Sequence, residues 1–149
     1  MNHCEEFVRS MYDMAQRSNC DHPWLRILCE HGRVMTPKIV HDISGTQEMG
    51  QCYRNSALLM MSDEFTYCEG YALKPGLIPL EHAWLLDRDG LVIDPTWPEE
   101  CEYFGVPMKE EFVLDMATSI QHYGIGTNLF MLRQSVDHIY KRLQAGIHV

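Results

Sequence analysis

The sequence predicts a single α+β domain in which helices flank a short antiparallel sheet. Three observations support this class: apolar residues at helical spacing near both ends, three strand-like runs between residues 65 and 94, and turn signals that separate those runs. A chain of 149 residues has the length of one ordinary domain. No repeat, linker or low-complexity tract divides it, so we expect residues 1–149 to fold as one unit.

The expected helices lie at both ends of the chain and near its centre. A 3-4-3 apolar spacing marks the first, and Pro23 and Gly32 bound the second. An apolar run without Gly or Pro predicts a buried central helix, and Gly124-Ile125-Gly126 divides the last two. The five predicted ranges are residues 4–17, 24–31, about 52–62, 109–123 and 128–144.

The three strand-like runs are typical of an antiparallel meander. They are Phe65–Leu73, Leu80–Leu86 and Leu91–Asp94. Lys74-Pro75-Gly76 separates the first two, and Asp87-Arg88-Asp89-Gly90 separates the last two. Residues 34–49 are expected to be mostly irregular, and three prolines, at 95, 98 and 107, are expected to break up the stretch after Asp94.

The net charge and the first residues of the chain indicate which partners and which location to expect. The net charge is −9, from 12 Lys and Arg against 21 Asp and Glu, so we expect neither nucleic acid nor membrane as a partner. The same charge favours neutral or basic substrates. The first residues are neither basic nor followed by an apolar stretch, and no apolar run approaches 18 residues, which predicts a cytoplasmic protein. The oligomeric state stays open.

The six cysteines, at positions 4, 20, 29, 52, 68 and 101, form no CxxC pair and are expected to be reduced. Cys20-Asp21-His22 and Cys29-Glu30-His31 could suggest zinc, but structural zinc motifs space their ligands differently. We therefore expect no metal and no organic cofactor. Five of the thiols are interpreted as packing residues, and Cys52 stands apart.

Cys52 begins the predicted central helix, and a helix N-terminus together with a neighbouring imidazole favours the thiolate form of a cysteine. The chemistry also needs a histidine, and an acidic or amide side chain to hold its ring. His82 and Asp94 follow Cys52 in the required order. Taken singly, each has an ordinary alternative: a buried core thiol, a hydrogen-bonded strand histidine and an aspartate that ends a strand.

The register of the last predicted hairpin decides whether His82 and Asp94 lie on the same face of the sheet. If Arg88-Asp89-Gly90 is a three-residue loop with Gly90 in the left-handed conformation, Asp87 pairs with Leu91. His82 and Asp94 then project from the same face as diagonal neighbours. A two-residue loop would place Asp94 on the other face. We prefer the three-residue loop because Gly suits its special position.

Three segments together resemble a known family. Gly50-Gln51-Cys52-Tyr53 resembles the nucleophile turn of transglutaminases, and His82-Ala83-Trp84 and Val92-Ile93-Asp94-Pro95-Thr96-Trp97 resemble the segments that supply the other triad members. The resemblance spans residues 50–97. It implies the transglutaminase-like branch of the papain-like cysteine enzymes, in which a helix carrying Cys packs on a short antiparallel sheet. More loosely, the chain is similar to small phage and bacterial proteins.

The resemblance also implies weaker candidates and some limits. Papain relatives use a Gln before the Cys to bind the oxyanion, and Gln47 and Gln51 compete for that role beside the Cys52 N–H. Independently of the resemblance, four aromatic residues are candidates to line a substrate cleft, with core packing as the alternative: Trp84, Tyr71, Trp97 and Tyr103. Tyr53 replaces the family's Trp, and no acidic calcium loop is evident, so a calcium-dependent transglutaminase is not expected.

The predicted function is cysteine-dependent chemistry on an amide-type bond through a Cys52-His82-Asp94 triad and a thioacyl intermediate. Hydrolysis, by a peptidase or a deamidase or amidase, is preferred because nothing in the chain indicates a second, amine-binding site. Substrates would be a protein, a peptide or a small amide. The alternatives are acyl transfer onto an amine, and a catalytically silent protein-binding module with the same fold.

Overall fold

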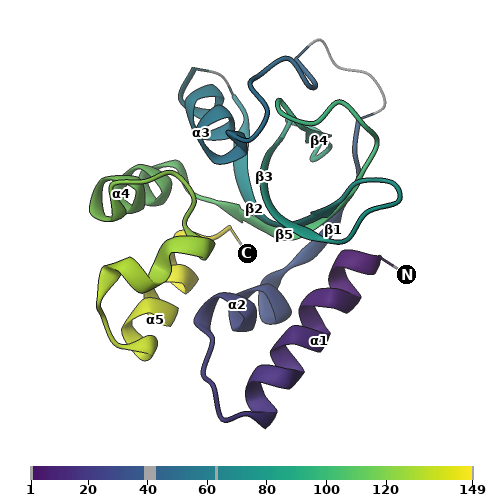
Figure 1. Cartoon of the computed structure of the whole chain (residues 1–149). Coiled ribbons are helices and arrows are strands. Elements are labelled where there is room, and N and C mark those ends of the chain that lie inside the picture. The colour runs from purple at the N-terminus through teal and green to yellow at the C-terminus, as the bar shows by residue number, and fades with distance from the viewer. Residues whose placement is uncertain (1, 39–42, 63, 149) are drawn as a thin grey trace.

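The computed structural model describes residues 2–38, 43–62 and 64–148, and it confirms the α+β class. Its centre is a curled antiparallel sheet with the strand order β1-β5-β2-β3-β4, and the helices lie outside the curl (Figure 1). The strands are β1 Arg33–Met35, β2 Thr66–Leu73, β3 Leu80–Leu86, β4 Val92–Ile93 and β5 Glu102–Met108.

Local capping explains where several helices begin. The Asn2 side chain accepts the Glu5 N–H at the start of α1, and Ser135 does the same for His138 at the start of α5. The helices are α1 His3–Arg17, α2 Pro23–His31, α3 Cys52–Ser62, α4 Glu110–Ile120, the 3-10 helix η1 Gly126–Leu132 and α5 Val136–Gly146. The first three agree with the predicted ranges within a residue at each end.

The predicted helix over 128–144 is wrong in its first half. Residues 126–132 form a 3-10 helix, which ends at Arg133 in the left-handed conformation, with φ 53°. The α-helix begins only after Ser135 has capped a new first turn. The apolar spacing in this region therefore belongs to two short elements that pack on the same core.

The meander of β2, β3 and β4 is confirmed, whereas β1 and β5 were not expected. Pro107 was read as a strand breaker, yet it pairs with Cys68 inside β5. β1 pairs only with residues 103–105, so Pro107 lies beyond its end. The Pro107 carbonyl accepts the His148 N–H at 2.9 Å on that side, so the proline nitrogen points away from β2 and removes no hydrogen bond to β2.

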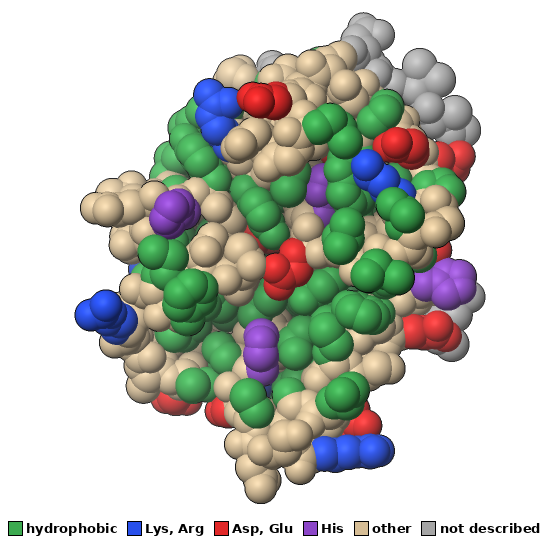
Figure 2. Space-filling view, in the orientation of Figure 1, with side chains coloured by type: hydrophobic (Ala, Val, Ile, Leu, Met, Phe, Trp, Pro, Cys, Tyr) green, Lys and Arg blue, Asp and Glu red, His purple; other side chains and the backbone are tan. Residues whose placement is uncertain are grey.

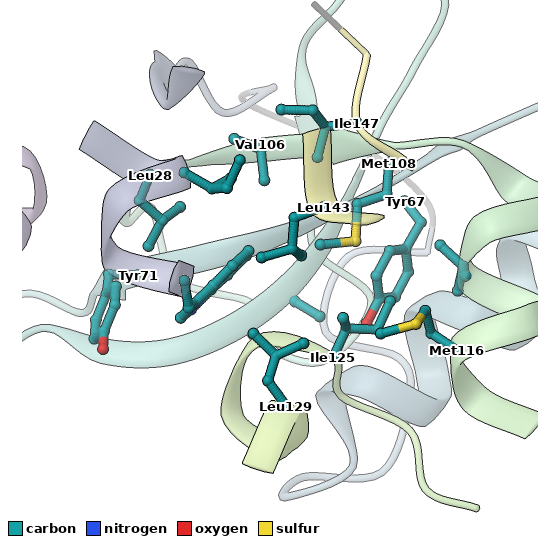
Figure 3. Close-up of a cluster of buried hydrophobic side chains, with 14 of the residues drawn as sticks. Leu28, Tyr67, Tyr71, Val106, Met108, Met116, Ile125, Leu129, Leu143 and Ile147 are labelled. Carbon is teal, nitrogen blue, oxygen red and sulfur yellow. The ribbon is translucent and has the colours of Figure 1, made fainter. Parts of the chain in front are cut away.

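The sheet separates two hydrophobic clusters. The larger one joins the helices to the outer face, with residues such as Leu28, Tyr67, Val106 and Leu143 (Figure 3). The smaller one lies on the other face of the sheet. It contains Trp84 of β3 together with residues of the other four strands and of the chain after β4. Because side chains alternate along a strand, His82 shares the face of Trp84 and lies with this smaller cluster. None of the described helices is both long and apolar enough to cross a bilayer.

Candidate active site

The β3–β4 hairpin has the expected three-residue loop. Asp87 N–H donates to the Leu91 carbonyl at 2.9 Å, and Gly90 has φ +77°. The register pairs Leu86 with Val92. This register confirms the prediction that His82 and Asp94 project from one face of the sheet.

The two side chains are in direct contact and almost fully buried. His82 Nε2 donates to Asp94 Oδ2 at 2.7 Å, and the residues are 1% and 4% exposed. The Tyr103 hydroxyl donates to the same oxygen at 2.8 Å, and the N–H groups of Thr96 and Trp97 donate to Oδ1 at 2.9 and 3.0 Å. Four donors therefore hold the carboxylate in one orientation.

The surroundings of His82 favour its charged form. Burial opposes the charge, but the hydrogen bond with Asp94 and then that with Cys52 outweigh it and raise the pKa of His82 to about 9. The Trp97 ring stacks on the imidazole with centroids 3.6 Å apart. His82 is thus an imidazolium at neutral pH, and because Nε2 is bound to Asp94, Nδ1 is the nitrogen left for the Cys52 sulfur.

Cys52 is the first residue of α3 and is half-buried. Gly50, with φ +82°, turns the chain into the helix, and the Gln51 carbonyl accepts the first helical hydrogen bond from Asn55 N–H at 2.8 Å. α3 packs chiefly along β3, the strand that carries His82. The three predicted triad residues are therefore brought together.

The other cysteines differ from Cys52 in their surroundings. Burial raises the pKa of the Cys4 thiol to about 12 and of the Cys101 thiol to about 11, and it raises that of Cys68 further. Cys29 is half-buried, and burial raises its pKa as well. Cys20 is exposed, so the expectation that it packs in the core is wrong.

Hydrogen bonds join the loop before Cys52 to the segment that follows β4. Asn55 Nδ2 donates to the Glu48 carbonyl at 2.8 Å and to Thr96 Oγ1 at 3.0 Å. The backbone N–H groups of Gly45 and Gln47 donate to the carbonyls of Asp94 and Pro95 at 2.9 and 2.8 Å. These bonds fix the thiol-bearing end of α3 relative to the aspartate.

The sequence analysis missed the roles of three residues in this site: Asn55, Trp97 and Tyr103. An amide one turn after the nucleophile, just before the apolar run of the helix, was the available signal for Asn55. Trp97 and Tyr103 were considered only as aromatic residues of a core or cleft. Their contacts with His82 and Asp94 depend on the tertiary fold.

Two of the weaker candidates are corrected by the structure. Trp84 is fully buried, and its indole N–H donates to Met35 Sδ at 3.2 Å, so it belongs to the core. Tyr71 is 8% exposed, packs in the larger cluster on the other face of the sheet, and donates to Glu81 at 3.2 Å. Neither lines a cleft at the triad, because both side chains are enclosed by neighbours.

Gln47 and Gln51 are both exposed and both stay predictions for the oxyanion role. The Gln47 amide lies 3.5 Å from Thr46 Oγ1, and Gln51 lines a groove beside α3. As for metals, within residues 2–38, 43–62 and 64–148 no three His, Cys, Asp or Glu side chains form a ligand cluster. The His22 ring instead caps α2 by accepting the Leu25 N–H.

Comparison of the chain with protein-family models, with curated proteins and with solved structures gives no match. The interpretation of the site therefore depends on its own geometry. That geometry is a half-buried thiol at a helix start, a buried imidazole beside it whose pKa is raised, and a carboxylate that holds the imidazole.

Proposed function

We propose that this chain is a cysteine-dependent enzyme that cleaves an amide-type bond, with Cys52 as nucleophile, His82 as acid and base, and Asp94 as the group that orients His82. The observation that carries the proposal is the buried His82 ring, bound to Asp94 at 2.7 Å through Nε2 and adjacent to Cys52. An imidazolium beside a sulfur at a helix start favours the thiolate. The α+β arrangement supports membership of the transglutaminase-like branch of the papain-like fold.

The reaction would proceed in two stages. The Cys52 thiolate attacks the carbonyl carbon, a C–S bond forms, and the carbonyl electron pair moves to oxygen. When the tetrahedral intermediate collapses, the C–N bond breaks and the leaving amine takes the proton from His82 Nδ1. Water then gives a proton to His82 and attacks the thioester, which releases the acid and restores the thiolate.

Negative charge on the carbonyl oxygen needs fixed donors. The Cys52 N–H, at the free N-terminal end of α3, is one candidate. The side-chain amide of Gln51 or of Gln47 is the second, because both precede the nucleophile closely and both are exposed to an incoming substrate. Replacing each Gln by Ala separately identifies the donor, since loss of one is expected to lower turnover about 100-fold.

Hydrolysis is preferred to acyl transfer because nothing in the sequence indicates a second, amine-binding site. Amine transfer would follow the same first stage, with an amine in place of water. A cytoplasmic location fits the proposal, since all six cysteines are unpaired thiols, the state that a reducing compartment maintains.

Alkylation by iodoacetamide tests the proposal, and Cys20 provides an internal standard because it is an exposed thiol in the same molecule. Mass spectrometry measures the labelling rate of each cysteine from pH 5 to pH 9. We expect Cys52 to react faster than Cys20 at pH 6, and His82→Ala to abolish that advantage. Equal rates at pH 6 would exclude an activated nucleophile and favour a silent binding module.

A further inference from the structure

Two side chains donate to the same oxygen of Asp94. His82 Nε2 and the Tyr103 hydroxyl both donate to Oδ2, at 2.7 and 2.8 Å. The N–H groups of Thr96 and Trp97 hold the other oxygen, Oδ1, at 2.9 and 3.0 Å. The backbone bonds to Oδ1 would keep the carboxylate oriented even without Tyr103. The tyrosine hydroxyl therefore has a second effect, because it competes with His82 for the charge of Oδ2.

The sheet and an aromatic contact hold Tyr103 at this oxygen. Tyr103 lies in β5, pairs with Met35 of β1 and Ala72 of β2, and is 1% exposed. Its ring packs against Trp84, with centroids 4.9 Å apart and 57° between planes. Burial, and then the charge of Asp94, raise the pKa of Tyr103 far above its ordinary value. The hydroxyl thus keeps its proton and stays a donor across the neutral pH range.

Other titratable groups lie near the pair without a bond to Oδ2. In the described part of the chain, those that face His82 or Asp94, or that line the space beside them, are Cys52 of α3, Lys38 after β1, Lys74 after β2, and Glu99, Glu100 and Cys101 between β4 and β5. Lys74 Nζ lies 4.6 Å from the centroid of the Trp97 ring. On the face that Figure 2 shows, most charged side chains lie toward the margin. The charge of Oδ2 is therefore divided chiefly between its two donors.

We propose that Tyr103 is a positioning residue of the reaction: it takes part of the charge of Asp94 Oδ2 and so weakens the hold of the carboxylate on the charged His82 ring. The inference rests on the proposed function, since His82 passes a proton in catalysis only if Cys52 is the nucleophile. A hydrogen bond to a charged acceptor stabilises the charge on that acceptor. Oδ2 therefore stabilises the imidazolium less than it would with His82 as its single donor.

This division of charge matters when the leaving amine departs. As the C–N bond breaks, the proton moves from His82 Nδ1 to the amine nitrogen, and the ring becomes neutral. A general acid works best when its pKa lies near the working pH. The pKa of His82 is already raised to about 9, so a tighter hold by Asp94 would slow this proton transfer.

NMR titration of the His82 ring tests the inference. The chemical shift of its Cε1 atom, measured from pH 5 to pH 10 in ¹³C-labelled protein, gives the pKa of the ring. Every protein compared carries Cys52→Ala, so that no thiolate titrates beside the ring. In this background, Tyr103→Phe should raise the pKa of His82 by about one unit, which is a tenfold gain in proton affinity.

Tyr67→Phe is the matched control. Tyr67 is also 1% exposed and also donates to a buried carboxylate, that of Glu69, but it packs in the larger cluster on the other face of the sheet. Each substitution removes one oxygen atom and one buried hydrogen bond, so both should lower the melting temperature. Tyr67→Phe should leave the pKa of His82 as it is in the Cys52→Ala protein.

The outcomes separate the two proposals. An unchanged or lower pKa of His82 in Tyr103→Phe overturns the inference and limits Tyr103 to packing and orientation. Equal rises in Tyr103→Phe and Tyr67→Phe also overturn it, since the change would then follow from a general loss of stability. In either case, fast labelling of Cys52 by iodoacetamide at pH 6 in the wild type leaves the proposed function standing. Slow labelling contradicts the proposed function, and with it a part for Tyr103 in the reaction.

Discussion

The indole ring of Trp97 lies nearly parallel to the imidazole of His82, with 3.6 Å between ring centroids and 15° between planes. The Trp97 backbone N–H donates to Asp94 Oδ1, so one residue contacts both members of the pair. An aromatic face stabilises an adjacent cation, and more so where water is excluded. The stacked indole therefore supports the imidazolium form of His82 and restricts rotation of its ring.

Replacing Trp97 by Ala should slow the labelling of Cys52 by iodoacetamide at pH 6 by about tenfold, since a desolvated cation–π contact contributes on this scale. Trp97→Phe keeps an aromatic face and should recover most of the rate. The informative measurement is the labelling rate of Cys52 as a function of pH. In Trp97→Ala this rate should fall more at low pH than at high pH. A loss of thermal stability with an unchanged profile would assign Trp97 a packing role alone.

The raised pKa of His82 predicts a pH dependence of stability. The pKa is about 9 in the folded protein and about 6.5 in the unfolded chain, so this group stabilises the fold fully below pH 6.5. The contribution is lost as the pH rises through 9. Urea denaturation from pH 6 to pH 10 should show this decrease in the wild type. Ionisation of the buried thiols also lowers the free energy of unfolding above pH 8. The wild type is therefore compared with Asp94→Asn, which has the same thiols.

Asp94→Asn retains those thiols but lacks the charged partner of His82, so its free energy of unfolding should fall less steeply between pH 7 and pH 9. Parallel curves for the two proteins would show that His82 has an ordinary pKa in the fold.

Asn55→Ala should destabilise the protein by about 2 kcal/mol, because the Glu48 carbonyl and the Thr96 hydroxyl lose a buried partner. It should also slow Cys52 labelling, because the loop before the nucleophile is no longer tied to the segment after Asp94. Ser62→Ala, at the exposed far end of α3, controls for effects on the helix and should change stability by less than about 0.5 kcal/mol. Unchanged labelling in Asn55→Ala would limit Asn55 to a role in stability.

Glu69→Ala should cost about 3 kcal/mol or more, because the N–H groups of Ile125 and Gly126 and the Tyr67 hydroxyl lose their acceptor. Burial raises the pKa of Glu69, while these donors oppose the rise. Hydrogen exchange should become faster at the amides of Ile125 and Gly126. Glu69→Gln retains one acceptor oxygen and should show a smaller effect. Slow exchange of both amides in Glu69→Ala would contradict this role of Glu69.

Local sequence was sufficient where short-range chemistry decides the structure. The α3 range follows from a concentrated apolar run without Gly or Pro, and the β3–β4 register follows from a glycine that adopts φ +77° at the end of its loop. That register alone places His82 and Asp94 on one face. β5 was not predicted, because it pairs with β2, whose partner residues lie 29 to 41 positions earlier in the chain. Local propensity carries no information about such a partner, nor about the edge that tolerates Pro107.

The sequence by itself therefore determined the fold class, the bounds of the helix that begins at Cys52, and the shared face of His82 and Asp94. Only the tertiary structure decided how these residues are held. Asn55, Trp97 and Tyr103 reach the site through contacts between segments that lie apart in the chain, and the same contacts enclose Trp84 and Tyr71. The physical reason is that a turn or helix depends on neighbouring residues, whereas burial and the charge state of a histidine depend on everything that packs around it.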